Sequence, residues 1–201
     1  MKTANVRKKL LESSYELFLS RGYNAASVDE ICRKSGVSKG SFFHYFKSKE
    51  ILGVEVLRWY YAYATELIMS GEFLNETYPF KRLFGFIDHT ENVAEQLWGK
   101  GCLLGSFVTD LSETNKKVAA EVSNIFSGMT GELSKLFYPV SQINNKVTSE
   151  ELAEQYLLII EGAIILAKAK NEWKKVVTAI HNFRYYLELL MKKNDTLVQA
   201  K

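Results

Sequence analysis

Apolar residues recur every three or four positions along most of this chain, which is the spacing of one face of an α-helix. The first such segment runs from about residue 3 to residue 20, and its apolar face consists of Val6, Leu10, Leu11, Leu17 and Phe18. Similar patterns cover residues 49–70, 79–98, 102–111, 118–137, 148–169 and 173–193. No stretch alternates strictly between apolar and polar residues, so the pattern predicts an all-α protein with about nine helices.

Several residues mark the expected helix ends. Pro79 suits the first position of the fifth helix, because its missing N–H is not needed there. Thr148 and Glu151 have the capping-box spacing and open the eighth helix. Pro139 follows the apolar stripe of the seventh helix, and we expect that helix to end at this proline.

Two short helical patterns between residues 27 and 46 are separated by a tight turn. Ser27 is a favourable N-cap, and Glu30 lies at the capping-box distance from it. Gly36 ends the first pattern, because a glycine adopts positive φ at little cost. Ser38 caps the second pattern. This arrangement predicts a helix-turn-helix, whose second helix enters a DNA major groove.

The second short helix has an apolar face and an unusual outer face. Phe42 and Phe46 share the apolar face and should pack on the first helix. The opposite face carries Gly40, Ser41, Phe43 and His44. Small residues permit close approach to DNA, a serine hydroxyl can bond a base or a phosphate, and a phenyl ring can lie on a thymine methyl group.

Positive charge is concentrated around this helix. Lys39 precedes the outer face, Tyr45 flanks it, and Lys47 and Lys49 follow, where they can bind backbone phosphates. Residues 1–50 have a net charge of +5, whereas the rest of the chain has −2. Helix-turn-helix shapes also occur in proteins that never touch nucleic acid, and scattered lysines are usually a solvated face. The charge asymmetry favours DNA binding over that alternative.

The run GVSKGSFFHYFKSKEIL, from Gly36 to Leu52, and the preceding GYNAASVDEI resemble the N-terminal signature of the TetR/AcrR family of bacterial transcription regulators. The resemblance implies that Ser27 and Tyr45 contact phosphate, that Lys39 to His44 form the recognition face, and that Lys49 binds phosphate at the start of the fourth helix. Cys32 departs from the pattern, since the family usually has alanine there. The resemblance also implies a DNA-binding domain at residues 1–49 and a ligand-binding and dimerisation domain at residues 50–201.

The family holds a small effector in its C-terminal domain, in a cavity lined by aromatic and other side chains. The corresponding residues of this sequence are Trp59, Tyr63, Phe86, His89, Trp98, Cys102, Phe107, Phe126 and Tyr156. An apolar or aromatic effector with one or two polar anchors suits such a lining. Ordinary core packing is the alternative role for most of these side chains.

The last two helices are more apolar than a surface helix requires. The run LLIIEGAIILAKA, from Leu157 to Ala169, is apolar almost all round and must be covered on two sides. The final helix carries a stripe of Trp173, Val176, Val177, Ile180, Phe183, Leu187 and Leu190. We predict a homodimer in which a second copy completes a four-helix bundle, as in the family. The alternative is that both are core helices of a monomer.

A dimer also suits the expected DNA. Two DNA-binding domains whose recognition helices lie about 34–36 Å apart match a palindromic double-stranded operator, because its half-sites are one helical turn apart.

Cys102 supports a second interpretation of the regulatory step. It lies in KGCLLG, and some TetR-like repressors that respond to electrophiles or oxidants resemble this sequence, with a cysteine at the start of the sixth helix. Lys100 and a helix N-terminus would both favour the reactive thiolate. A small buried apolar residue is the plain alternative, because cysteine often has that role.

Other classes of protein are disfavoured. The sequence lacks a Gly-rich phosphate loop, a nucleophile elbow and HExxH, so we expect neither an enzyme nor a cofactor. His44, His89 and His181 are far apart, which predicts no metal site. No signal peptide or membrane span is evident, and the two distant cysteines fit a reducing cytoplasm.

These observations predict a cytoplasmic repressor that a small molecule releases from its operator. The remaining alternatives are the sensor acting through Cys102, a low-specificity nucleoid-type DNA binder, and a ligand carrier that no longer reads DNA.

Overall fold

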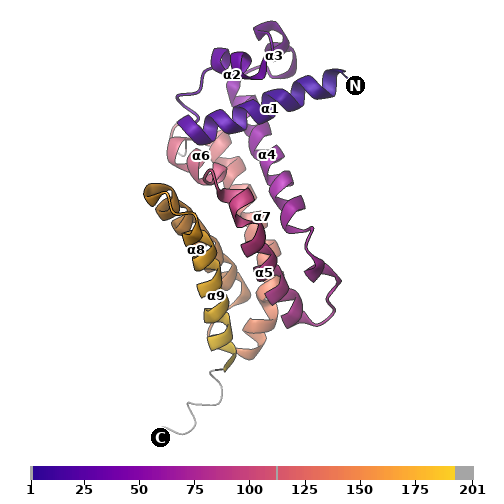
Figure 1. The fold of residues 1–201 in the computed structure, drawn as a ribbon, viewed down its shortest axis with the longest axis vertical. Helices are drawn as coiled ribbons and strands as arrows, with labels where there is room; N and C mark the ends of the chain where they lie inside the picture. Colours follow the sequence, from indigo (N-terminus) through magenta and orange to yellow (C-terminus); the bar gives the residue numbers. More distant parts are fainter. Residues whose placement is uncertain (1, 112, 193–201) are drawn as a thin grey trace, which may run out of the picture. The chain divides into compact units, whose positions relative to one another are not determined.

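The structure, a computed structural model, describes residues 2–111 and 113–192 (Figure 1). These residues form nine α-helices and one 3-10 turn, and none of them lies in a strand. The α-helices are α1 (Lys2–Arg21), α2 (Val28–Ser35), α3 (Lys39–Tyr45), α4 (Lys49–Ile68), α5 (Pro79–Trp98), α6 (Leu103–Leu111), α7 (Lys116–Ile143), α8 (Ser149–Lys170) and α9 (Lys174–Lys192), and the 3-10 turn is η1 (Glu72–Asn75). Over these residues, no helix combines the length and the apolar character needed to cross a membrane.

The chain divides into two compact units. Unit 1 consists of Met1–Thr65 and Lys100–Ile125, and unit 2 of Glu66–Gly99 and Phe126–Lys201. Two of the three boundaries fall inside α4 and α7, so each of these helices contributes residues to both units, and the third lies between α5 and α6. The functional division at residue 49 remains a prediction.

The core of unit 1 lies between α1 and its neighbours. α1 packs on α2 and α6, and α2 packs on α3. Leu10 and Phe18 of α1 are fully buried. The ring of Phe107 from α6 lies 5.4 Å from that of Phe18 and 5.2 Å from that of Tyr23. The fit between α6 and α1 therefore depends on aromatic packing.

Hydrogen bonds join the end of α6 to the loop that follows α1. Asp110 accepts a bond from the Tyr23 N–H at 2.8 Å, and its backbone carbonyl accepts one from the Asn24 side chain at 3.1 Å. Gly22 has φ +82°, and a Cβ atom at this position would lie 2.7 Å from a carboxylate oxygen of Asp110. Glycine is therefore required here both by the backbone conformation and by the close approach of Asp110.

Unit 2 is built around contacts of α9. α8 and α5 both pack on α9, and η1 packs on α5. Four aromatic rings from four helices, Phe86, Phe137, Tyr156 and Phe183, meet with centroids 5.1–6.0 Å apart. The predicted capping box at the start of α8 is confirmed.

The predicted end of the seventh helix at Pro139 is wrong, because α7 continues through this proline to Ile143. Proline removes one backbone donor and normally disfavours a helix interior. Here, however, Val140 is fully buried, and its carbonyl accepts a bond from the Asn144 N–H at 2.9 Å. The Asn144 side chain also donates to the Leu190 carbonyl of α9 at 3.1 Å. Burial and these bonds hold the last helical turn in place.

The apolar faces of α8 and α9 are only partly covered within the chain. Exposed apolar side chains on these helices are Leu158, Ile165, Leu166, Val177, Tyr185 and Leu189. Of the apolar stripe predicted for α9, Val176 and Leu187 are buried within the chain, whereas Val177 is exposed and Leu190 is half-buried. The predicted helix end at Lys193 lies outside the described residues.

Candidate functional site

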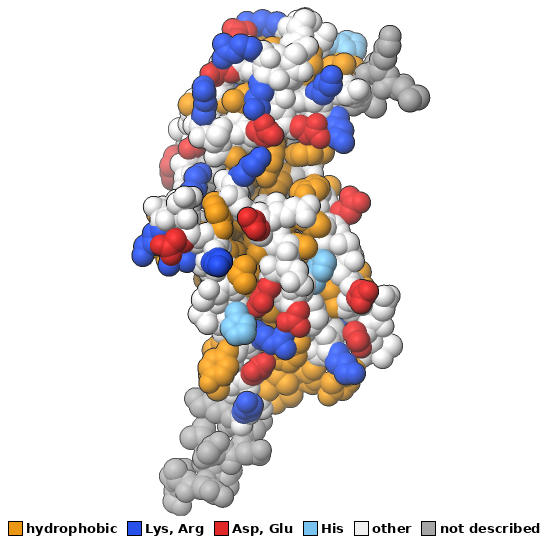
Figure 2. All heavy atoms as spheres, viewed as in Figure 1, with side chains coloured by type: hydrophobic (Ala, Val, Ile, Leu, Met, Phe, Trp, Pro, Cys, Tyr) orange, Lys and Arg blue, Asp and Glu red, His pale blue; other side chains and the backbone are white. Residues whose placement is uncertain are grey.

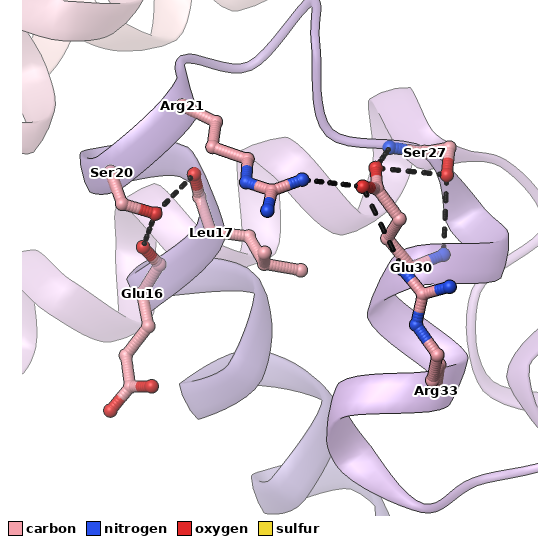
Figure 3. Close-up of polar contacts among 7 residues, drawn as sticks. All are labelled: Glu16, Leu17, Ser20, Arg21, Ser27, Glu30 and Arg33. Carbon is pink, nitrogen blue, oxygen red and sulfur yellow. Dashed lines mark hydrogen bonds and ion pairs between the residues drawn. The ribbon is translucent and has the colours of Figure 1, made fainter.

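α2 begins with a complete capping box (Figure 3). The Glu30 N–H donates to the Ser27 hydroxyl oxygen at 3.2 Å, and the Ser27 N–H donates to the Glu30 carboxylate at 3.0 Å. These bonds satisfy donors that would otherwise be free at the helix start. The bond from the Ser27 backbone, followed by that from its hydroxyl, holds the pKa of Glu30 below its usual value.

The Glu30 carboxylate also ties α2 to α1. The Arg21 guanidinium, at the end of α1, donates to it at 2.7 Å, as Figure 3 shows, and Arg33 lies 3.8 Å away. A second ion pair joins Lys34 of α2 to Glu16 of α1 at 2.8 Å. Each exposed pair contributes little by itself. Together they fix the orientation of α2 on the long helix beneath it.

The turn between α2 and α3 follows the sequence prediction. Gly36 adopts φ +67°, in the left-handed region, and the Val37 N–H donates to the Cys32 carbonyl at 3.1 Å. Ser38 then caps α3 by accepting from the Ser41 N–H at 3.2 Å. The Ser38 hydroxyl donates to the Ser41 hydroxyl at 3.0 Å. Both helices of the motif therefore start at fixed, hydrogen-bonded residues.

α3 presents the two faces that its sequence predicts. Phe42 is 0% exposed and Phe46, just after the helix, is also buried. On the other side Phe43 is 41% exposed, which is a large exposed area for a phenyl ring. The remaining outer positions are exposed Lys39, Gly40 and His44 and half-buried Ser41 and Tyr45. The structure thus brings all the predicted recognition residues onto one short helix.

Two lysines of this region have protein partners that the sequence analysis missed. Lys39 Nζ lies 2.8 Å from a carboxylate oxygen of Asp29 on α2. Lys49 Nζ lies 4.3 Å from the centre of the Tyr23 ring and 3.4 Å from the Asn24 carbonyl oxygen. Burial against these groups lowers the pKa of Lys49. In both cases the partner lies in a different element of the chain, so the local sequence pattern could not predict the contact.

Acidic residues therefore moderate the positive charge of the motif. In the space-filling view, basic side chains are interspersed with acidic ones over α1 to α3 at the top (Figure 2). Lys47 remains exposed, with its Nζ 3.4 Å from the Phe43 carbonyl. The exposed cations around α3 can bind phosphate, while the small and aromatic residues of the helix can approach base edges.

The predicted effector-binding residues are divided between the two units. In unit 1, the Trp59 and Tyr63 rings are stacked at 6.3 Å, and Tyr15 contacts Trp59 at 5.8 Å. Phe107 packs in the core between α1 and α6, so core packing explains the burial of its side chain. Cys102 is 7% exposed and immediately precedes α6.

In unit 2, the Phe86 and Tyr156 rings lie 6.0 Å apart. His89 contacts the Phe73 ring at 5.9 Å, and its Nε2 lies 3.0 Å from the Leu67 carbonyl oxygen. Trp98 is buried and Phe126 is half-buried. Burial is the main cause that raises the pKa of the Tyr156 hydroxyl above its usual value. Within the described ranges, no group of three or more His, Cys, Asp and Glu side chains could hold a metal ion.

Comparison with known proteins agrees with this geometry. Residues 10–56 match the family model described as bacterial regulatory proteins, tetR family. The chain is 30% identical over 169 residues to the HTH-type transcriptional repressor DhaR of Mycobacterium sp. (strain GP1), with 83% of this chain and 84% of that protein covered. It is 38% identical over 117 residues to the HTH-type transcriptional repressor NemR of Escherichia coli K12, covering 54% and 57% of the two chains.

Solved structures share the fold. A TetR transcriptional regulator from Chloroflexus aurantiacus has a TM-score of 0.80 at 19% identity, with 93% of this chain and 96% of that chain covered. The reduced form of E. coli NemR has a TM-score of 0.70 at 23% identity, with 90% and 96% covered. Since the helix-turn-helix matches the family model and the similarity to DhaR extends over most of both chains, this protein belongs to the TetR family and is a DNA-binding transcriptional regulator.

Proposed function

We propose that this protein is a transcriptional repressor that binds a palindromic operator as a homodimer and leaves it when a small effector binds. The observation that supports this proposal most is the outer face of α3. Phe43, His44 and Gly40 are exposed there on a helix whose start is fixed by Ser38. DhaR and NemR, the two relatives compared above, are both named repressors.

Within the proposed DNA-binding domain, residues 1–49, each residue type has a distinct role. Ser41, Phe43 and His44 approach base edges, and Gly40 leaves room for the backbone to come close. Lys39, Tyr45 and Lys49 bind phosphates, as does Ser27 at the start of α2. For Lys49 this requires its ammonium group to leave the Tyr23 ring or to bind phosphate from beside it.

The uncovered apolar faces of α8 and α9 support the proposed homodimer. Leu158 is 73% exposed and Ile165 is 65% exposed, although other apolar residues of the same helix, such as Ile160, are buried. Large apolar patches on a folded protein commonly mark an interface. A two-fold dimer would also present two copies of α3 to the two half-sites of a palindrome.

The aromatic side chains of unit 2 support binding of an apolar or aromatic effector. The protein needs two forms, one that fits the operator and one that does not. The effector has only to bind the second form more tightly than it binds the first. A tenfold preference supplies about 1.4 kcal/mol of coupling. Because it acts on DNA in a bacterium, we place this repressor in the cytoplasm.

A second candidate mechanism is an electrophile or redox sensor in which Cys102 is modified. The sequence similarity to NemR, whose solved structure is that of a reduced form, favours it. Burial of the Cys102 side chain opposes it, since a reagent must reach the sulfur. If Cys102→Ser protein still leaves DNA normally on treatment with an electrophile, this mechanism is excluded.

Selection of bound fragments from random DNA by the purified protein, at physiological salt, tests the main proposal. An enriched palindrome with half-sites about one helical turn apart is the expected result. Retention of DNA without enrichment would instead indicate a nucleoid-type binder, because such binding depends on phosphate charge alone. If the protein retained no DNA at all, the ligand-carrier alternative would be favoured instead.

A further inference from the structure

The ring of Tyr23, in the loop between α1 and α2, is held in place by the core of unit 1. Its centroid lies 5.2 Å from that of Phe18 on α1 and 5.2 Å from that of Phe107 on α6. The Tyr23 N–H donates to the Asp110 carboxylate of α6 at 2.8 Å, and the side chain is only 7% exposed. Packing against two helices and this hydrogen bond therefore fix the position of the ring.

α4 passes close beside the same ring. A Cβ atom at Gly53 would lie 2.8 Å from a ring carbon of Tyr23, so the close approach requires glycine at this position. Lys49 lies four residues earlier on the same face of α4, and its Nζ lies 4.3 Å from the centre of the ring. The same Nζ donates to the Asn24 carbonyl at 3.4 Å. The loop after α1 thus contacts the Lys49 ammonium with a ring and a carbonyl.

The contact between Lys49 and Tyr23 joins a cation to a neutral ring. Burial is the main cause that raises the pKa of the Tyr23 hydroxyl to about 12, so the side chain is uncharged near neutral pH. An aromatic face attracts an ammonium group without neutralising it. A lysine ammonium has three N–H donors, and the ring and the carbonyl can engage two of them. The third can bond to a phosphate oxygen.

Lys39 has the opposite arrangement. Its Nζ lies 2.8 Å from the Asp29 carboxylate, which carries a full negative charge that a phosphate must displace. The ring and the carbonyl beside Lys49 carry only partial negative charge, so they restrict the lysine without cancelling its charge. A free lysine loses rotamer freedom when it binds a phosphate, whereas a lysine that is already held loses less.

We infer that Tyr23 is a positioning residue for DNA binding, whose ring holds the Lys49 ammonium where it binds a backbone phosphate. This inference rests on the proposed phosphate contact of Lys49. Tyr23 acts through Lys49 and needs no contact with DNA, which agrees with the burial of its side chain. Because α1 and α6 fix the ring, this phosphate contact depends on residues outside the helix-turn-helix.

Two replacements of Tyr23 separate the ring from the hydroxyl. Tyr23→Leu removes the ring and should weaken binding to duplex DNA by about 2- to 12-fold per subunit, which is the cost of immobilising one long side chain. Tyr23→Phe keeps the ring and should bind as tightly as the native protein. Fluorescence anisotropy of the full chain at low salt measures the affinity. A labelled duplex of arbitrary sequence suffices, because phosphate contacts do not depend on sequence.

A fluorinated ring removes the attraction without removing the packing. A trifluorinated phenylalanine at position 23 keeps the shape of the Phe side chain but withdraws the negative charge from its face. This protein should bind DNA more weakly than Tyr23→Phe does. The comparison remains informative if Tyr23→Leu fails to fold.

The same measurements in a Lys49→Ala background separate positioning from general destabilisation. If Tyr23 acts through Lys49, Tyr23→Leu causes no further loss of affinity once the ammonium is absent. A purely structural role would instead weaken binding equally in both backgrounds. Tyr60→Leu is the matched control, because it removes another buried tyrosine ring of unit 1, further along α4. Any loss that it causes should be the same in both backgrounds.

Three results would overturn the inference: tighter binding by Tyr23→Leu, equal losses in the two backgrounds, or equal binding by the fluorinated protein and Tyr23→Phe. Tighter binding would mean that the ring withholds Lys49 from DNA. Lys49→Ala alone tests the underlying contact, since it should make the slope of log affinity against log salt shallower by about 0.9 for each lysine removed. An unchanged slope would contradict the proposed role of Lys49 itself, so the two failures are distinguishable.

Discussion

Phe42 and Phe43 are adjacent residues of the same type with opposite environments. The first is fully buried and contacts the Phe46 ring at 6.1 Å, whereas the second is exposed on α3. Phe42→Ala should therefore lower the unfolding free energy by about 3–5 kcal/mol. Phe43→Ala should lower it by less than about 1 kcal/mol and instead change which DNA sequences are preferred. Urea unfolding and binding to a panel of operator variants measure both effects, and equal destabilisation by the two changes would contradict this assignment.

The ion pair between Asp29 and Lys39 gives a second prediction for single residues. Both side chains are exposed, and the carboxylate competes with DNA phosphate for the lysine ammonium. Asp29→Asn frees Lys39 and removes a repulsive charge, so binding to all DNA sequences should tighten by roughly 2- to 5-fold at low salt. The gain should shrink as salt is added.

Fluorescence anisotropy over a salt series measures this effect. Glu154→Gln removes one negative charge far along the sequence, in α8, and controls for net charge alone. A gain of the same size in the control, or no gain in Asp29→Asn, would mean that Lys39 is not restrained by its neighbour.

At the scale of single elements, the capping box of α2 makes its stability depend on pH. Because the folded pKa of Glu30 lies below the usual 4.5, its contribution is fully present above about pH 4.5 and is lost as the pH falls through the folded value. Glu30→Gln keeps an acceptor oxygen but cannot carry the charge. The difference in unfolding free energy between native protein and variant should therefore decrease below pH 4.5.

Urea unfolding at several pH values on both sides of 4.5 checks this dependence. Glu154→Gln again supplies the control, because it changes the same residue type on an exposed helix face. A native-minus-variant difference that grows on acidification would show that Glu30 does not act through its ionised form.

Helix starts were predictable from the sequence, whereas one helix end was not. The capping boxes at Ser27 and Thr148 involve residues three positions apart, so the interaction is present in the sequence itself. Pro139 was misassigned because the turn that follows it is stabilised by the burial of Val140 and by the bond from Asn144 to α9. Those contacts depend on a helix that begins more than thirty residues later.

The site was predictable to a similar, partial extent. The inner and outer faces of α3 follow from helical periodicity, and the structure agrees with them. The partners of Lys39 and Lys49 depend on how α2 and the loop at Tyr23 fold against them.

For the whole molecule, the proposed homodimer predicts that a charge on the apolar face of α8 separates the subunits. Ile165→Glu should weaken dimerisation at least about tenfold, because burial of an isoleucine side chain contributes about 1.5–3 kcal/mol. Binding to a palindrome should fall, while binding to a single half-site should be retained. Sedimentation equilibrium and DNA titration measure the two effects.

Leu74→Glu is the matched control, since Leu74 is also an exposed apolar residue of unit 2 but lies in η1. Equal loss of dimer in the control would point to general destabilisation. A native protein that stays monomeric at high concentration would contradict the proposed homodimer itself.

The bonds between Asp110 and the loop at residues 22–24 limit how such a regulator can be recombined. A chimaera cut at residue 49 would separate Gly22 and Tyr23 from Asp110, and Phe18 from Phe107. The graft would lose a hydrogen-bond acceptor and one side of its core together. A transferable DNA-binding unit must therefore include residues 100–125 as well. Substitutions at Gly22 and Asp110 should also covary among related sequences.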